Sequence, residues 1–198
     1  MAAHPDIAIS TGFADEERAH VAALYWQSFG AKLTHVLGPK ERAEAFFVQI
    51  LNPKFALVAR DQAGTLLGLA GLKTAEGGLL DGTFSELSRS YGWFGAVWRG
   101  AVLSVLERNL QDGVLQMDGI FVDATARGRG VGTALLSAVS DQARARGATS
   151  VQLDVIDTNP RARALYEKVG FRPVSEERTG PFKWVFGFSS ATRMERPV

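Results

Sequence analysis

The 198-residue chain alternates between segments with the apolar period of strands and segments with that of helices. Short apolar or alternating runs bounded by turn residues predict strands at residues 6–10, 55–60, 65–73, 115–122, 150–156, 171–177 and 182–196. Apolar residues spaced three or four apart predict helices at residues 15–37, 39–51, 91–110, 131–146 and 160–169. Residues 74–90, which are rich in Gly and Ser, are expected to be the least regular segment.

The helix predicted at residues 131–146 belongs to a strand–helix–strand unit. Gly147 ends this helix, and the strands at 115–122 and 150–156 on either side of it should therefore be parallel. The segments 55–60 and 65–73 are joined by a turn and predict a hairpin. The closing strands are expected to be antiparallel. Because no repeat or long linker divides the chain, we predict one α+β domain.

The composition argues against several classes of function. With 22 Lys and Arg against 21 Asp and Glu, the chain has no global charge to attract nucleic acid or an anionic membrane. There is no cysteine for a disulfide, a thiolate ligand or a nucleophile, and only three histidines, all near the N-terminus, which argues against a zinc site. No apolar run reaches 18 residues, and the N-terminus lacks the pattern of a signal peptide. We expect a soluble, cytoplasmic protein.

A glycine-rich turn connects the strand at 115–122 to the next helix. It reads Arg127-Gly128-Arg129-Gly130-Val131-Gly132-Thr133. The first N–H groups of a helix lack intrahelical partners and carry the positive end of the dipole, so glycines there let a phosphate or pyrophosphate come close. Alternatively, the glycines only satisfy positive φ angles and the arginines are solvated. We favour the anion site.

Three kinds of phosphate-binding loop compete for this turn. No lysine follows the glycines, which excludes a P-loop. A dinucleotide fingerprint needs a glycine where Thr133 stands, and too little chain follows residue 156 to complete a doubly wound sheet. The remaining pattern, Arg/Gln-x-x-Gly-x-Gly/Ala, is matched by Arg127-x-x-Gly130-x-Gly132.

Three further motifs occur in order around this turn. They are Met117-Asp118-Gly119-Ile120-Phe121-Val122, Asn159-x-x-Ala162-x-x-Leu165-Tyr166-Glu167-Lys168-x-Gly170-Phe171, and Arg193-Met194-Glu195. Together with the turn, they resemble the signature segments of the GNAT N-acetyltransferase superfamily, specifically from about residue 115 to 171 and by element order elsewhere. The resemblance implies a three-layer α/β arrangement in which helices flank a mixed, mostly antiparallel central sheet of about six or seven strands. It also implies a single domain over residues 1–198 with a helical insertion at about residues 74–112.

The resemblance implies acetyl-CoA as co-substrate and no metal. In the family, main-chain groups of the central strand and amides of the glycine-rich turn hold the CoA. The matching positions here are Ile120, Phe121, Val122, Arg127, Gly128, Arg129, Gly130, Val131, Gly132 and Thr133. Asn159 and Ala162 match positions in the signature beside the pantetheine arm, although Asn159 ahead of Pro160 equally fits a helix N-cap.

Two residues match catalytic positions of the family. Tyr166 corresponds to the tyrosine proposed to protonate the departing CoA thiolate; a partly buried helix tyrosine is its alternative explanation. Asp118 is the candidate general base, although it could instead bind substrate or a neighbouring group. Alternation places Asp118 on the face of Gln116 and Ile120 if no bulge intervenes. Asp123, at the end of the strand, is better explained as a turn cap.

The acceptor cannot be identified from the sequence. The insertion carries the aromatic residues Tyr91, Trp93, Phe94 and Trp98. Three explanations are open for these aromatic residues: they line an acceptor pocket, they form a lid or a homodimer contact, or they pack into the core. Core packing explains most of them.

The main functional hypothesis is an N-acetyltransferase that moves an acetyl group from acetyl-CoA directly to a primary amine of a small molecule or peptide. A non-catalytic acyl-CoA-binding sensor or interaction domain is the alternative from a different class. A nicotinamide-dependent enzyme is a weaker third hypothesis. Acetyl-CoA and an amine are the expected partners, with no nucleic acid and no membrane.

Overall fold

The computed structural model describes residues 6–104, 110–180 and 183–198, and only the backbone of residues 31 and 32. Its strands are β1 (Ala8–Thr11), β2 (Ala56–Arg60), β3 (Leu66–Thr74), β4 (Gly77–Gly78), β5 (Val114–Val122), β6 (Ser150–Ile156), β7 (Arg172–Arg178) and β8 (Ser190–Pro197). Its helices are α1 (Arg18–Leu37), α2 (Lys40–Ile50), α3 (Phe84–Tyr91), α4 (Trp93–Ser104), α5 (Val131–Ala145), α6 (Pro160–Lys168) and α7 (Lys183–Phe186). Short 3₁₀ turns are η1 (Asp15–Glu17), η2 (Pro53–Phe55) and η3 (Ala124–Ala126).

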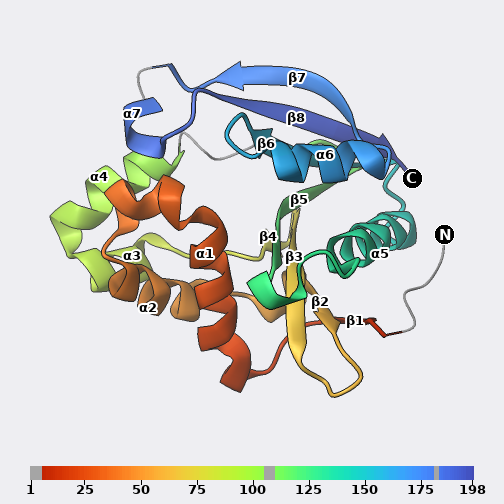
Figure 1. The fold of residues 1–198 in the computed structure, drawn as a ribbon. Helices are drawn as coiled ribbons and strands as arrows, with labels where there is room; N and C mark the ends of the chain where they lie inside the picture. The colour runs from red at the N-terminus through yellow and green to blue at the C-terminus, as the bar shows by residue number, and fades with distance from the viewer. Residues whose placement is uncertain (1–5, 105–109, 181–182) are drawn as a thin grey trace.

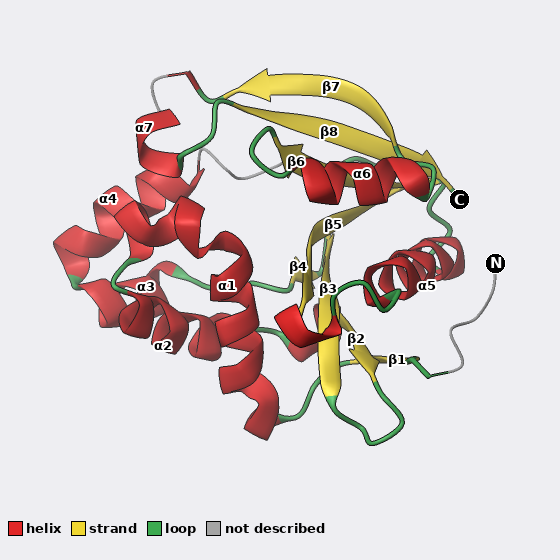
Figure 2. Ribbon diagram, in the orientation of Figure 1, coloured by secondary structure: helices red, strands yellow, loops and turns green. Residues whose placement is uncertain are grey.

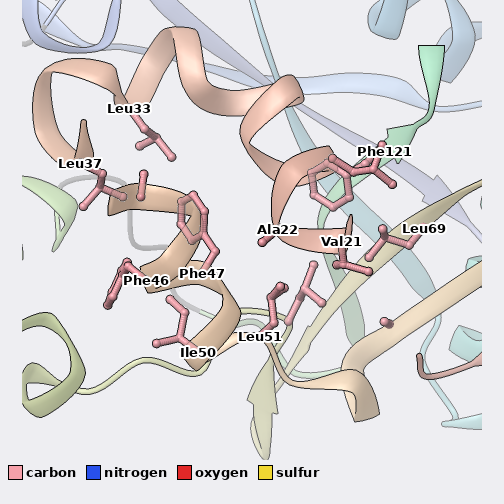
Figure 3. Close-up of a cluster of buried hydrophobic side chains, with 14 of the residues drawn as sticks. Val21, Ala22, Leu33, Leu37, Phe46, Phe47, Ile50, Leu51, Leu69 and Phe121 are labelled. Atoms are coloured by element: carbon pink, nitrogen blue, oxygen red, sulfur yellow. The ribbon is translucent and has the colours of Figure 1, made fainter. Parts of the chain in front are cut away.

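One mixed sheet runs through the molecule in the order β1-β2-β3-β5-β6-β8-β7, and β4 pairs with β3 outside this path. Figures 1 and 2 show α1–α4 grouped on one side of the strands and α5 on the other. One buried apolar cluster joins α1 and α2 to β3 and β5, as Val21, Phe47 and Phe121 illustrate in Figure 3. A second cluster packs α5 and α6 against the opposite face. The mixed, helix-flanked sheet agrees with the predicted fold class.

The central strands β5 and β6 separate partway along their length. They pair in parallel, as predicted, but only between Val114–Gln116 and Ser150–Gln152. On its other side, β5 pairs with β3 in antiparallel fashion as far as Val122. From residue 117 onward, the edge of β5 that faces β6 is therefore left without strand pairing. Such an edge can accept an extended ligand through main-chain hydrogen bonds.

A β-bulge interrupts β5 at Asp118. Met117 lies opposite Leu72 of β3, and Gly119 lies opposite Gly71, so Asp118 is an extra residue in the ladder. A bulge reverses the alternation of side chains beyond it. Accordingly, Met117 is buried on the α5 side of the sheet, whereas Phe121 is buried on the α1 side.

Most predicted elements are found, including the antiparallel β2–β3 hairpin. Residues 74–90, expected to be irregular, instead contain β4 and most of α3. Thr83 and Glu86 explain this helix, because the Glu86 carboxylate accepts the Thr83 N–H (2.9 Å) and the Thr83 hydroxyl oxygen accepts the Ser85 N–H (3.2 Å).

The helix predicted at 91–110 begins later than expected. Gly92, at φ +73°, separates α3 from α4, and residues 105–109 of the prediction lie outside the described residues. The last predicted strand, 182–196, is also wrong at its start, because residues 183–186 form α7 and β8 begins at Ser190.

Among the described helices, none combines the length and apolar character that crossing a bilayer requires.

Candidate active site

A cavity of about 560 Å³ lies on the α1–α4 side of the sheet, where β5 and β6 diverge. Its charged and amide groups come from three strands: Lys73 of β3, Gln116 and Asp118 of β5, and Asp154 of β6. Thr83, ahead of α3, and Ser104 of α4 add hydroxyl groups. Its walls are mainly apolar and come from α1, α2, α3, α4 and the segment around β8; they include Tyr25, Phe29, Phe46, Phe84 and Phe188. Such a volume and lining are typical of small-molecule sites.

The bulge fixes which way Asp118 faces. Asp118 lines the cavity together with Gln116, as the alternation predicted. Ile120, however, packs with the α5 cluster on the opposite face. A shared face with Asp118 was expected only in the absence of a bulge, and a bulge is present. The physical reason is the extra residue, which shifts every later side chain of β5 to the other side.

The cavity also shifts the pKa of Asp118. Burial raises the pKa of its carboxyl group, while the nearby Lys73 ammonium and a hydrogen bond with the backbone of Leu79 act to lower that pKa. The side chain keeps a large accessible surface, and this surface opens into the cavity, whose walls surround the carboxyl group with protein atoms. Desolvation therefore prevails, and the carboxylate is a stronger base than an ordinary aspartate.

Tyr25 of α1 also lines the cavity, although no sequence pattern distinguishes it. Its ring lies between three phenylalanines, with centroid separations of 5.0 Å to Phe29, 4.6 Å to Phe47 and 5.1 Å to Phe121. Burial, and to a smaller extent the charge of Asp118, raise the pKa of its hydroxyl. It therefore remains a neutral phenol beside the carboxylate. In the sequence it is one aromatic residue among several on an apolar helix.

Tyr166 lies on the other face of the sheet. It is only 5% exposed, its ring centroid is 5.9 Å from that of Phe171, and burial raises the pKa of its hydroxyl. It is not among the residues lining the Asp118 cavity. The two candidate catalytic residues are linked through Met117, which belongs to the Tyr166 cluster and also lines the cavity.

The glycine-rich turn leads into the N-terminus of α5, which no side chain caps. Gly128 and Gly130 have φ angles of +81° and +84°, and Gly130 is the N-cap of α5. No side chain caps this end, and the first intrahelical bond is donated by Ala134 to the Gly130 carbonyl (3.0 Å). The N–H groups of residues 131–133 therefore have no intrahelical acceptor.

Other residues of the turn also have packing roles. A Cβ on Gly132 would lie 2.9 Å from Cδ2 of Leu165, so this glycine lets α5 and α6 pack closely. The Nε of Arg127 donates to the Val122 carbonyl (3.3 Å), while Arg129 is exposed. Phe121 is buried in the α1 cluster, so only its main chain faces the open edge of β5.

Two polar residues act as caps, as expected. The Oδ1 of Asn159 accepts the N–H of Ala162 (3.1 Å), with Pro160 in the first helical turn of α6. Asp123 accepts the N–H of Thr125 (2.8 Å), and hydrogen bonds from Thr125 lower the pKa of its carboxyl group.

The aromatic residues of the insertion do not behave as one group. Tyr91 is buried and its hydroxyl donates to the Leu37 carbonyl (2.5 Å), in line with core packing. Trp93, Phe94 and Trp98 are 62%, 82% and 43% exposed, so core packing is wrong for them. None of these four lines the cavity; α4 contributes Gly100, Leu103 and Ser104 instead.

Among the described residues, no group of three or more acidic or histidine side chains is placed to hold a metal ion.

Comparisons with known proteins agree with this geometry. The family model described as "Acetyltransferase (GNAT) family" matches residues 18–171. Over 54 residues the chain is 54% identical to a mycothiol acetyltransferase of Beutenbergia cavernae, a match that covers 27% of this chain and 18% of that protein. Over 65 residues it is 37% identical to the uncharacterized N-acetyltransferase YobR of Bacillus subtilis, covering 33% of this chain and 26% of that one. The matched segments thus span only a minor part of these relatives.

Solved structures show the same fold. A GCN5-related N-acetyltransferase from Kribbella flavida superimposes with a TM-score of 0.64 at 20% identity, covering 99% of this chain and 100% of the other. An N-acetyltransferase from Staphylococcus aureus Mu50 gives a TM-score of 0.68 at 17% identity, with coverages of 96% and 100%. Since the family model covers most of the chain and the fold agrees along its whole length, the protein belongs to the acetyltransferase (GNAT) family.

Proposed function

We propose that this protein is an N-acetyltransferase that transfers an acetyl group from acetyl-CoA directly to a primary amine. The observation that carries the proposal is the position of Asp118, at the point where β5 leaves β6 and on the wall of a largely apolar cavity. We further propose that residues 1–198 act as one domain and that the protein works in the cytoplasm.

The donor site that we propose uses main-chain N–H and C=O groups that no neighbouring strand or helical turn pairs with: those on the edge of β5 that faces β6 and the first N–H groups of α5. The edge of β5 at Ile120–Val122 would pair with the pantetheine arm, as an added strand does. The open N-terminus of α5, from Arg127 to Thr133, would receive the pyrophosphate, with Arg127 and Arg129 adding positive charge. Asn159 and Ala162 lie at the start of α6, whose packing against α5 supports this arrangement.

The proposed chemistry is a direct displacement. Acetyl-CoA supplies a thioester whose carbonyl carbon the acceptor nitrogen attacks, so that a C–N bond forms and the C–S bond breaks. Asp118 takes the proton that the amine loses, for which its raised pKa suits it. Tyr166, kept protonated by burial, delivers a proton to the departing thiolate. Met117 belongs to the same buried cluster as Tyr166 and also lines the cavity of Asp118.

Calorimetric titration with acetyl-CoA tests the donor site. We expect binding by the wild type and none by Gly130→Glu, because a carboxylate there would repel and obstruct the pyrophosphate. Gly64→Glu is a matched control, since Gly64 has the same φ of +84° in the β2–β3 turn and no atom within 4 Å of its Cβ position. Loss of binding in both variants, or in neither, would contradict the proposed donor site.

A further inference from the structure

Lys73 and Asp118 form a pair of opposite charges in the cavity. Lys73 lies opposite Gln116 in the β3–β5 ladder, and Asp118 follows two residues later on β5. Gly78 of β4 sits between the two side chains, because a Cβ placed on it would lie 3.2 Å from the Asp118 Oδ2 and 3.4 Å from the Lys73 Cγ. Because both residues line the cavity, a ligand bound in it has the Asp118 carboxylate and the Lys73 side chain on the same wall.

The other charged group of the cavity is balanced within the protein. The Oδ1 of Asp154 accepts a hydrogen bond from the Nε of Arg193 at 3.3 Å. The acceptor thus faces one ammonium group and one carboxylate rather than a cluster of acids. This arrangement disfavours polyamines, because a second cationic group would lie beside Lys73 without a carboxylate to balance it. An acceptor that carries its own anion would instead neutralise Lys73.

We propose that the acceptor is a free α-amino acid with an aromatic or branched apolar side chain, and that Lys73 binds its carboxylate. The α-amine then lies beside Asp118, while the side chain packs among Tyr25, Phe29 and Phe46. This inference rests on the proposed acetyl transfer and assigns its substrate class.

The acid–base chemistry of α-amino groups agrees with this assignment. The α-amine of a free amino acid has a lower pKa than an alkylamine such as a lysine side chain, although its own carboxylate holds that pKa above the value near 8 of a peptide N-terminus, so more of the α-amine is neutral at physiological pH. The Lys73 charge further favours the neutral form of a nearby amine, which is the form that attacks. Asp118 then has only a weakly held proton to remove.

A matched set of acceptors tests the assignment. L-Phenylalanine, L-phenylalaninamide and phenethylamine share one ring and one amine, but only the first carries a carboxylate, and only the first two carry a carbonyl group next to the amine-bearing carbon. We expect kcat/KM, measured by CoA thiol release, to be about 10- to 100-fold higher for phenylalanine than for its amide, as a charge-assisted contact implies. Spermidine should be the poorest acceptor.

Lys73→Gln should reduce the preference for phenylalanine over its amide to within about threefold, chiefly by raising the KM for phenylalanine. Lys54→Gln, at an exposed lysine of η2, is the matched control and should keep the preference. Retained binding of acetyl-CoA by Lys73→Gln would show that the variant is folded.

The two levels of the proposal fail in different ways. Equal or better use of phenethylamine, an unchanged preference in Lys73→Gln, or no turnover of any acceptor despite acetyl-CoA binding would overturn the substrate class while leaving the donor site intact. Absence of acetyl-CoA binding would overturn the proposed function. In that case, titration with phenylalanine alone still decides whether the cavity binds an amino acid in a manner dependent on Lys73.

Discussion

At the scale of single residues, the environment of Asp118 matters more than its identity. An aspartate on an ordinary exposed strand would be ionised and weakly basic, but the walls of the cavity raise the pKa of this one. The opposing effect of Lys73 is part of the same arrangement, so the carboxylate remains available as a base. Tyr166 is also buried, and burial likewise raises the pKa of its hydroxyl, which keeps this phenol protonated.

Asp118→Asn and Tyr166→Phe should therefore separate catalysis from binding. We expect each to lower kcat by about 100-fold or more while acetyl-CoA still binds, as expected for loss of a general base or acid. Asp141→Asn, at an exposed residue of α5, is the control and should have wild-type turnover. A sensor domain without catalytic activity would show no turnover in the wild type and unchanged binding in every variant.

The pH profile provides a second readout of Asp118. Because the carboxylate must be ionised to accept a proton, activity should rise with pH through its raised pKa, and this limb should disappear in Asp118→Asn. Lys73 holds that pKa down, so Lys73→Gln should move the limb to higher pH. A limb that stays in place in both variants would assign it to another group.

At the scale of elements, an ion pair joins the start of α1 to the β2–β3 hairpin. Glu17 of η1 accepts from both terminal nitrogens of Arg60, with Nη2 at 2.7 Å from Oε2, and its carboxylate also accepts the Ala14 N–H (2.8 Å). These contacts lower the pKa of Glu17 to about 2, the hydrogen bond from Arg60 being the largest cause. The pair anchors the helix that carries Tyr25 into the cavity.

Glu17→Gln should lower the melting temperature at neutral pH by roughly 2–4 °C, which corresponds to about 1 kcal/mol for a partly exposed pair. The carboxylate has a lower pKa in the folded state, so its contribution is complete above the unfolded value of 4.5 and is lost as pH falls through about 2. The difference between wild type and variant should therefore shrink over that range in thermal melts. Glu16→Gln, at an exposed neighbour, should show no such pH-dependent difference.

At the level of the whole molecule, the proposed donor site combines elements that flank the point where β5 and β6 separate. It uses the edge of β5, the start of α5 and the start of α6, which belong to one packed unit. The proposed acceptor cavity is lined in part by residues of α1–α4. Figure 1 shows these helices on the side of the sheet opposite α5. The proposed donor site and the proposed acceptor cavity meet where β5 separates from β6.

Acetyl-CoA should accordingly stabilise the whole fold. At a ligand concentration of 100 times Kd, linkage predicts about 2.7 kcal/mol, or a melting temperature raised by roughly 5–10 °C for a chain of this size. NADH should cause no comparable shift, and Gly130→Glu should lose the shift with acetyl-CoA. A shift with NADH alone would favour a nicotinamide-dependent enzyme instead.

The sequence by itself determined the features that depend on local patterns. The strand–turn–helix around Gly130, the N-cap at Asn159 and the β2–β3 hairpin could be predicted, because their hydrogen bonds join residues close together in the chain. Helix α3 lies in the segment expected to be irregular, although its signal, Thr83 followed by Glu86, is also local. The surrounding Gly and Ser residues favour a loop and obscure that signal.

Only the tertiary structure decided how the distant segments meet. The bulge at Asp118 depends on the register between β3 and β5, and no short-range pattern fixes which residue of β5 is left unpaired. The cavity likewise brings together Tyr25, Lys73 and Asp118 from three separate stretches of chain. The raised pKa of Asp118 follows from that assembly, because desolvation is produced by whichever segments surround a group in space and not by its neighbours in the sequence.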